Sequence, residues 1–413
     1  MKVLVAHPAQ QHSYRLACAL KNADMLSKYA TTVYYKKRSL TYLVSKILKG
    51  NFKVKAQGRR CEELKDNEVI QFSEGKGLLK LLALNTRFLK KHYSSLKYST
   101  ADSFAKKAAE YAIKHKVDAV VTYDNTSPLL FEILKDKAPD ILRILDVSAA
   151  NPFYMRGIYE KDFELAPAFK DRLIRERRLV WDEEITSRTK REYELAQEFL
   201  VPSLFVAKTL EYSGLNTDKM HICPYGVDLK AFSPKEYDDV KNRPVEFIYV
   251  GGVKELKGIY YLLEAFKSIP KDRARLTVVG KVNKNDEDIK PYLDYVNFTG
   301  LVLHSDMPRL LRKSDVFILP SLGEGLSLSV LEAASCGLPF IISENCGVDE
   351  GMLSGNEGFI VPIQSVDAIK EKALWFCDNP ESLSKMGKSA AEFAAKYSWG
   401  DYSESIQTIF TKF

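Results

Sequence analysis

Short apolar runs rich in β-branched residues alternate with helical patterns along this chain, and the alternation restarts halfway. In the first half the runs lie at residues 2–6, 118–122, 141–145 and 198–202, and in the second at 245–250, 275–279, 316–319 and 340–343. Strands that alternate with helices at this spacing predict a parallel sheet covered on both faces. The sequence therefore predicts an α/β fold of two doubly wound, Rossmann-like units in series.

The polar stretch from Phe232 to Pro244 marks the join between the two units. We expect an N-terminal domain at residues 1–235 and a C-terminal domain at 236–395. The last segment, 396–413, has the pattern of a short amphipathic helix that either stays with the second unit or crosses back to the first. With 413 residues, the chain is long enough for each unit to bury its own core.

Apolar runs and cysteines indicate the cellular compartment of such a chain. No run approaches the roughly 20 apolar residues that span a bilayer, and the opening apolar run is too short for a signal peptide. We expect a cytoplasmic protein, either free or peripheral on the inner face of the membrane. The six cysteines form no C-x-x-C pair, which argues against a disulfide framework and a zinc site and favours reduced, mostly buried thiols.

Positive charge is concentrated near the N-terminus. The first 100 residues hold 20 Lys and Arg against 6 Asp and Glu, whereas the whole chain has a net charge of +7. Residues 40–49 and 78–93 have basic amphipathic patterns, which suit an anionic membrane surface met through residues 40–100, or equally helices that pack on the sheet with solvated lysines. Nucleic acid is not an expected partner, because no recognised binding motif interleaves aromatic and basic residues.

The segment 318–339 has the design of an anion-binding strand, loop and helix. An apolar strand ends near Leu319, a helix begins near Ser327, and Gly337 with Pro339 ends that helix. Gly323 and Gly325 are expected to let the backbone approach a ligand, and the helix start offers N–H groups to a diphosphate.

Two glutamates accompany this segment, Glu324 in the loop and Glu332 about two turns along the helix. Ionised carboxylates accept hydrogen bonds from hydroxyl groups, so the pair suits the two ends of a nucleotide sugar. The alternative is structural: Ser329 and Glu332 would form a helix capping box, and Glu324 would be a solvated loop charge. A second loop supports the first interpretation, because Gly251 and Gly252 follow the strand at 245–250 and Lys257 lies within reach of a phosphate.

The order of these motifs resembles family 4 glycosyltransferases of the bacterial envelope-polysaccharide and lipopolysaccharide type. The resemblance covers roughly residues 195–410 and only weakly the first 190. It rests on Pro224-Tyr225-Gly226-Val227-Asp228, Gly251-Gly252, Lys257-Gly258, Asn297-Phe298-Thr299-Gly300, Glu324-Gly325, Glu332-Ala333 and Gly337-Leu338-Pro339. It implies the two-domain GT-B fold, with the donor held by the C-terminal domain and the acceptor by the N-terminal one.

The resemblance also implies residue roles in donor binding. Glu324 would bind the transferred sugar, Glu332 the ribose and Lys257 the diphosphate. The backbone of Gly325, Leu326 and Ser327 would support the phosphates, and the loop around Leu301 would lie against the base. Where relatives carry an arginine, this chain has Gly252 and Leu256, so Lys254 would substitute as a point charge.

The loop after the first strand is expected to face the acceptor. It contains His7, Gln11, His12 and Ser13, and Asp146, in a later loop of the same unit, is also expected on the acceptor side. His12 or Ser13 would touch the acceptor or the departing phosphate, with His12 as a candidate catalytic residue. The alternative is a histidine that caps the helix or packs beneath the loop, and this interpretation is stronger for His7.

The functional hypothesis is metal-independent transfer of a hexose-type sugar from a nucleotide sugar, UDP- or GDP-linked, to a saccharide or lipid-linked saccharide. Relatives usually retain the anomeric configuration. Asp286-Glu287-Asp288 formally matches a metal-binding D-x-D, but its Lys/Asn-rich surroundings favour a solvated loop, so neither a metal nor a cofactor is expected. The rival hypotheses are an epimerase or phosphorylase of the same fold and a non-catalytic, peripheral-membrane module that binds sugar nucleotides.

Overall fold

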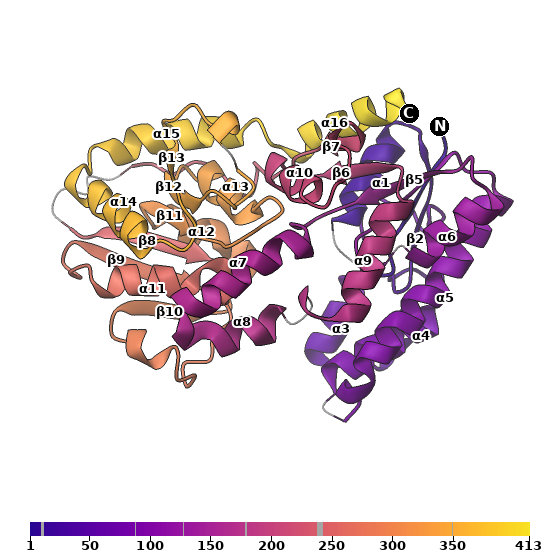
Figure 1. Ribbon diagram of the computed structural model, residues 1–413, viewed down its shortest axis with the longest axis horizontal. Coiled ribbons are helices and arrows are strands. Elements are labelled where there is room, and N and C mark those ends of the chain that lie inside the picture. The colour runs from indigo at the N-terminus through magenta and orange to yellow at the C-terminus, as the bar shows by residue number, and fades with distance from the viewer. Residues whose placement is uncertain (10–11, 87, 127, 178–179, 238–242, 349) are drawn as a thin grey trace.

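The computed structural model of the protein describes residues 1–9, 12–86, 88–126, 128–177, 180–237, 243–348 and 350–413. Within them the strands form two parallel sheets, one of seven strands in the order β3-β2-β1-β4-β5-β6-β7 and one of six in the order β10-β9-β8-β11-β12-β13 (Figure 1). In each sheet the order reverses beside the first strand of its unit. Ligands of such sheets bind at that reversal, outside the carboxyl ends of the strands.

The first sheet contains β1 (Val3–Ala6), β2 (Leu26–Thr31), β3 (Val69–Gln71), β4 (Ala119–Tyr123), β5 (Leu142–Asp146), β6 (Glu198–Val201) and β7 (Met220–Ile222). The second contains β8 (Val245–Val250), β9 (Ala274–Val279), β10 (Val296–Gly300), β11 (Val316–Leu319), β12 (Phe340–Ser343) and β13 (Gly358–Val361). The predicted α/β class is therefore confirmed, and each of the eight predicted strands is present.

The helices up to the join are α1 (Ser13–Asn22), α2 (Leu40–Ile47), α3 (Gly50–Gln57), α4 (Glu74–Asn85), α5 (Tyr93–Lys114), α6 (Pro128–Lys137), α7 (Pro152–Leu165), α8 (Lys170–Arg177), α9 (Glu183–Leu195) and α10 (Leu204–Glu211). Those after it are α11 (Ile259–Lys267), α12 (Met307–Arg312), α13 (Leu328–Ser335), α14 (Val366–Asp378), α15 (Ser382–Ala394) and α16 (Trp399–Lys412). None of the helices in the described parts of the chain combines the length and the apolar character that a bilayer crossing requires.

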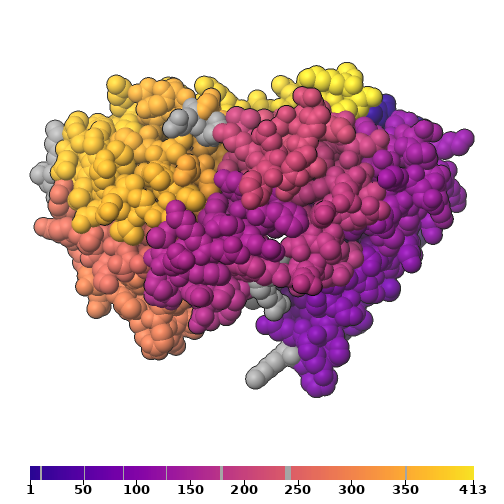
Figure 2. Space-filling view, viewed as in Figure 1, coloured from indigo at the N-terminus to yellow at the C-terminus, as the bar shows by residue number. Residues whose placement is uncertain are grey.

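Two segments cross between the units. Helix α16 returns to the first unit and packs against α1, where the Arg15 guanidinium lies 4.6 Å from the centroid of the Trp399 ring (Figures 1 and 2). Helices α7 and α8, which precede the predicted join at 235, lie against the second unit, and Phe169 between them contacts the rings of Tyr260 and Tyr292. A single cut at residue 235 therefore does not describe which segments pack together.

Candidate functional site

The two reversals of strand order bring four loops to the carboxyl ends of β1, β4, β8 and β11. Residues 7–12 follow β1 and residues 124–126 follow β4 in the first unit. In the second unit, 251–258 follow β8 and 320–327 follow β11. These loops contain most of the predicted site residues, because the topology that makes a doubly wound sheet also leaves a crevice there.

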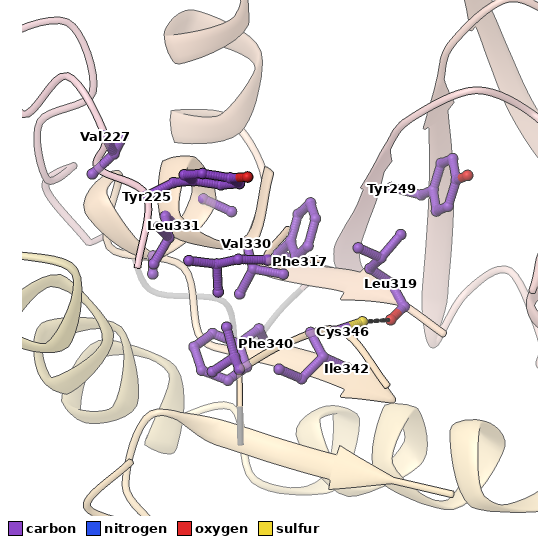
Figure 3. Close-up of a cluster of buried hydrophobic side chains, with 14 of the residues drawn as sticks. Tyr225, Val227, Tyr249, Phe317, Leu319, Val330, Leu331, Phe340, Ile342 and Cys346 are labelled. Atoms are coloured by element: carbon purple, nitrogen blue, oxygen red, sulfur yellow. Dashed lines mark hydrogen bonds between the residues drawn. The ribbon is translucent and has the colours of Figure 1, made fainter. Parts of the chain in front are cut away.

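Backbone hydrogen bonds to neighbouring loops fix the loop at 320–327. The Leu322 N–H donates to the Leu256 carbonyl at 3.0 Å, and the Glu324 N–H donates to the Asn345 carbonyl at 2.9 Å. The Cys346 thiol donates to the Leu319 carbonyl at 3.2 Å, beside buried apolar side chains of the sheet (Figure 3). The Glu324 backbone is therefore held before any ligand arrives.

Glu324 and Lys257, predicted for the sugar and the diphosphate, form an ion pair. The Lys257 ammonium contacts Glu324 Oε1, and the Ser321 hydroxyl donates to the same oxygen at 2.7 Å. Gly258 makes this approach possible: its φ is +66°, and a Cβ there would lie 1.8 Å from the Pro320 carbonyl oxygen. The structural alternative, a solvated Glu324, is wrong, since only 14% of its side chain is exposed.

Glu332 projects from α13 toward the loop after β10. Its Oε1 lies 2.9 Å from His304 Nε2, and its side chain is 15% exposed. Burial raises the pKa of Glu332, and the hydrogen bond with His304 opposes that shift. The capping-box alternative is wrong, because the helix N-cap is Ser327 and Ser329 already lies inside α13.

The glycines of this loop serve a contact that the sequence did not indicate. A Cβ on Gly323 would lie 2.5 Å from the Met155 methyl group, and one on Gly325 would lie 2.0 Å from the Ser148 carbonyl oxygen. Ser203, the N-cap of α10, also donates from its hydroxyl to the Gly325 carbonyl at 2.6 Å. In this conformation the close approach at Gly323 and Gly325 is to the first unit.

Arg172 of α8 corrects the prediction for the D-x-D segment. Its Nε and Nη2 donate to the two oxygens of Asp288, each at 2.7 Å, and Nη2 donates to Asp286 at 2.9 Å. Only Glu287, 86% exposed, is solvated as predicted. The two aspartates instead join the second unit to a helix that precedes the predicted join.

Helix α8 also contacts the loop that contains Lys257. Glu176 accepts a hydrogen bond from the Leu256 N–H at 3.4 Å. Burial raises the pKa of Glu176 to about 7, against the lowering effect of that backbone donor and of Arg172. Neither helix pattern nor charge pattern pointed to α8 as part of the donor side.

The remaining donor-side predictions fall around the same loops. Gly251 follows β8, and a Cβ on Gly252 would touch the alkyl chain of Lys254 at 3.2 Å. Leu301 is exposed beyond β10, whereas Leu326 is buried. The Leu301 side chain is thus open to solvent, whereas the Leu326 side chain is buried and leaves only the Leu326 backbone for a ligand in the loop.

His12 and Asp146 form the main polar contact on the first unit's side. His12 Nε2 lies 3.0 Å from Asp146 Oδ2 and 3.3 Å from the Tyr225 hydroxyl, although 134 residues separate His12 from Asp146. Burial lowers the pKa of His12, but the carboxylates of Asp146 and Asp124 outweigh burial, so the net shift is upward. His12 occupies the N-cap position of α1 without a side-chain cap hydrogen bond, and its ring packs against those of Tyr123 and Tyr225, as the alternative of a packed histidine predicted.

Other predictions for this loop need correction. Ser13 is fully buried and its hydroxyl lies 2.9 Å from that of Tyr29, so it does not face an acceptor. His7 accepts a hydrogen bond from the Ala9 N–H at 2.9 Å, and burial lowers its pKa to about 4, so it is a neutral structural imidazole. Gln11 lies outside the described residues.

A pocket of about 350 Å³ lies between the first unit and Gly323. Lys80 of α4, Lys97 of α5 and Asp124 after β4 line it. Burial and the nearby Asp146 raise the pKa of Asp124 to about 6. Sequence analysis missed these residues; the strand predicted at 118–122 gave a signal for Asp124, whereas nothing local distinguished the two lysines from solvated ones.

One pair of cysteines also departs from expectation. All six are free thiols, but Cys18 and Cys61 have their sulfur atoms 3.6 Å apart. With Glu63 they are the one group of potential metal ligands found among the described residues. Their separation of 43 residues explains why the search for C-x-x-C spacing gave no sign of them.

Comparison with known proteins agrees with this geometry. Residues 244–379 match the family described as Glycosyl transferases group 1. A D-inositol 3-phosphate glycosyltransferase of Paenarthrobacter aurescens is 24% identical over 46% of this chain and 51% of its own. An Escherichia coli UDP-Gal:alpha-D-GlcNAc-diphosphoundecaprenol alpha-1,3-galactosyltransferase is 30% identical over 36% and 43%. The chain thus spans about half the length of the relatives it matches.

Solved structures resemble the chain over its full length. Sucrose-phosphate synthase from Thermosynechococcus elongatus has a TM-score of 0.67 at 18% identity, covering 100% of this chain and 99% of its own. Anabaena HepE in complex with UDP-glucose has a TM-score of 0.62 at 12% identity, covering 100% of both. These likenesses and the two parallel sheets confirm the predicted GT-B fold, and the predicted resemblance to group 1 glycosyltransferases is confirmed for residues 244–379.

Proposed function

We propose that this chain, whose residues 244–379 form a Glycosyl transferases group 1 domain, moves a hexose-type sugar from a nucleotide-diphosphate sugar to a saccharide acceptor. The observation that carries the proposal is the Lys257–Glu324 pair, held at the carboxyl end of β11 with Glu332 on the adjoining helix. A cation for phosphate and two carboxylates for hydroxyls suit a UDP- or GDP-linked sugar.

Donor binding then exchanges one partner of Lys257 for another. The donor diphosphate takes over the ammonium with Lys254 and the backbone of Gly325 to Ser327, which frees the Glu324 carboxylate to accept from the sugar hydroxyls. Glu332 accepts from the ribose, and the base lies against Leu301. Because cationic side chains and backbone donors supply the positive charge on the phosphate side, we propose transfer without a metal ion.

In the transfer, the bond between the anomeric carbon and the donor phosphate oxygen breaks, and that carbon bonds to the acceptor oxygen. The nucleoside diphosphate leaves with the bonding electron pair and takes the proton of the acceptor hydroxyl, with retention of configuration. Protonated His12, held by Asp146, stabilises the charge that develops on the departing diphosphate. Closure of the two units around the reactants excludes the water that would hydrolyse the donor.

A donor panel tests the proposal against its rivals. With purified protein and a series of UDP- and GDP-linked sugars, one donor should release free nucleotide slowly alone and faster with a saccharide acceptor. Binding without release would support the non-catalytic module, and interconversion of sugars without nucleotide release would support an epimerase. Glu324→Ala should abolish release while Glu287→Ala, exposed in the same unit, keeps it; equal rates in the two variants would refute the site.

A membrane surface is the partner we propose for α2 to α4, and a lipid-linked saccharide is the matching acceptor. Helix α2 packs against α3 and α4, and apolar side chains on these helices are exposed, among them Leu43, Ile47, Phe52, Val54 and Leu82. Lysines accompany them, a combination that favours anionic bilayers. The relative from Escherichia coli is named for a lipid-linked acceptor, which agrees with a peripheral position on the inner face of the membrane.

Vesicle sedimentation tests this partner. The protein should pellet with vesicles that contain anionic lipid and stay in solution with zwitterionic ones. Ile47→Ser with Phe52→Ser should abolish pelleting, whereas Ile222→Ser, exposed on β7, should not. Unchanged pelleting in the double variant would refute the surface.

A further inference from the structure

Two lysines line the pocket beside Gly323. Lys80 extends from α4 and Lys97 from α5, and Tyr93 and Tyr98 line the same pocket. A smaller cavity of about 210 Å³ adjoins it, shares Lys80 and adds Arg59. Three cationic side chains thus line these two neighbouring cavities.

Neither lysine forms an ion pair with a carboxylate among the described residues. Within those residues Lys80 makes no hydrogen bond, and the Lys97 ammonium lies 5.4 Å from the centroid of the Tyr98 ring. The more distant carboxylates of Asp182, Glu192 and Asp124 raise the pKa of Lys97, but burial and the charge of Arg188 outweigh them. Burial lowers the pKa of Lys80 to about 8, and the positive charges of Arg59 and Lys97 add to that shift. Two other shielded cations do have carboxylate partners: Arg172 pairs with two aspartates and Lys257 with Glu324.

Uncompensated cations in a shielded pocket are costly to keep, so they indicate an anion that arrives from outside. The lining of the same pocket also includes Asp124 and Gly323, one residue before Glu324. An acceptor in this pocket would therefore have an anionic group at the lysines and a hydroxyl near the donor sugar.

We propose that the pocket binds a phosphate or diphosphate group of the acceptor through Lys80 and Lys97, while Asp124 accepts a hydrogen bond from an acceptor hydroxyl. This inference rests on the proposed glycosyl transfer and narrows its acceptor to a phosphorylated saccharide. The outward side of α4 exposes Leu79 and Leu82, so a phosphate that is attached to a lipid can approach along that helix.

Calorimetry with inorganic pyrophosphate tests the lysines apart from the donor side. Lys257→Gln serves as background, because it removes the donor-side phosphate partner. Adding Lys80→Gln and Lys97→Gln should weaken pyrophosphate binding at least about tenfold. Adding Lys76→Gln and Lys107→Gln, exposed lysines of the same two helices, should leave it unchanged. Equal affinity in both triple variants would overturn the proposal, whether or not the chain proves to be a transferase.

An acceptor panel distinguishes the sources of the phosphate. One saccharide is offered unmodified, as its 1-phosphate and as its lipid diphosphate. Both phosphorylated forms should have a KM at least about tenfold below that of the unmodified sugar, and Lys80→Gln with Lys97→Gln should remove that advantage. If the lipid form alone has it, the phosphate comes from a membrane carrier; if both do, a free sugar phosphate suffices. An unmodified sugar that is used equally well would overturn the proposal.

Discussion

The donor side and the acceptor side of this molecule handle charge in opposite ways. On the donor side the protein supplies its own counterions: Lys257 contacts Glu324, and His304 lies 2.9 Å from Glu332. In the pocket proposed for the acceptor, Lys80 and Lys97 form no ion pair among the described residues, and Asp124 lines the same pocket of about 350 Å³. One site holds its charges in direct pairs, and the other keeps two lysines without a paired carboxylate.

This difference matters because each member of an ion pair in a binding site occupies the group that the ligand would otherwise contact, so the pair competes with the ligand. Under the proposed function, a nucleotide sugar displaces Glu324 from Lys257 by offering a diphosphate to the lysine and hydroxyls to the glutamate. The paired state keeps both side chains oriented between turnovers. The acceptor pocket has no internal substitute, so its charge is satisfied only while an anion is bound.

The largest effect is expected for the paired lysine. Lys257→Met removes the cation that meets the developing phosphate charge, so donor turnover should fall about 100- to 1000-fold, the range for one lost electrostatic contact in a transition state. Initial rates of nucleotide release measure it, with Lys388→Met on exposed α15 as control. A rate like that of the wild type would break the comparison, because the pair would then not be the donor site.

Asp146→Asn probes the pair that orients His12, and kcat should fall about 10- to 100-fold. The folded-state pKa of His12 is raised, so the ion pair stabilises the protein fully below its ordinary value of 6.5 and loses that effect as the pH rises through the raised value. The variant's loss of Tm should therefore be larger at pH 6 than at pH 8. NMR titration of His12 and melting curves check this, with the exposed Asp136→Asn as control. A pH-independent loss would contradict it.

Glu332→Gln should have a smaller effect that is confined to binding. The amide keeps the shape of the side chain but accepts a weaker hydrogen bond from the ribose, so the donor KM should rise about tenfold with kcat nearly unchanged. Steady-state kinetics at several donor concentrations give both constants. A fall in kcat at constant KM would instead assign Glu332 to the reacting sugar.

The smallest expected effect is a gain in stability. Lys80→Gln removes a positive charge that has no anionic partner, so Tm should rise by roughly 2–4 °C, which corresponds to about 1 kcal/mol. The lowered pKa, about 8, sets the pH dependence: the gain is present below pH 8 and shrinks above it, where the native lysine becomes neutral. Lys76→Gln is the control. A loss of stability in Lys80→Gln would show that the charge is compensated.

Sequence reasoning found the inner strands of both sheets and missed all four at the sheet edges. The strands β3, β7, β10 and β13 end the two sheets, and each has residues that remain partly or fully exposed. An edge strand has one neighbour and a solvated side, so it lacks the continuous apolar run that identifies a buried parallel strand. Strand β2 was not predicted for a related reason, because its first three residues are only half-buried.

The donor side was predictable because its information is local. Glu324 and Glu332 lie in one strand-loop-helix segment, and the structure confirms that β11, the loop and α13 follow in the predicted order. The sequence alone could not indicate the partners that those residues have without ligand. Lys257 reaches Glu324 across 67 residues and His304 reaches Glu332 across 28.

What the sequence determined by itself is the pair of doubly wound units and the donor segment, since periodicity, turn residues and helix ends act over a few residues. Only the tertiary structure decided that α7 and α8 pack on the second unit, that Ser148 fills the space beside Gly325, and that His12 meets Asp146. It also placed Lys80, Lys97 and Asp124 around one pocket. Contacts between residues so distant in the chain depend on how sheets and helices pack, and no local pattern encodes that packing.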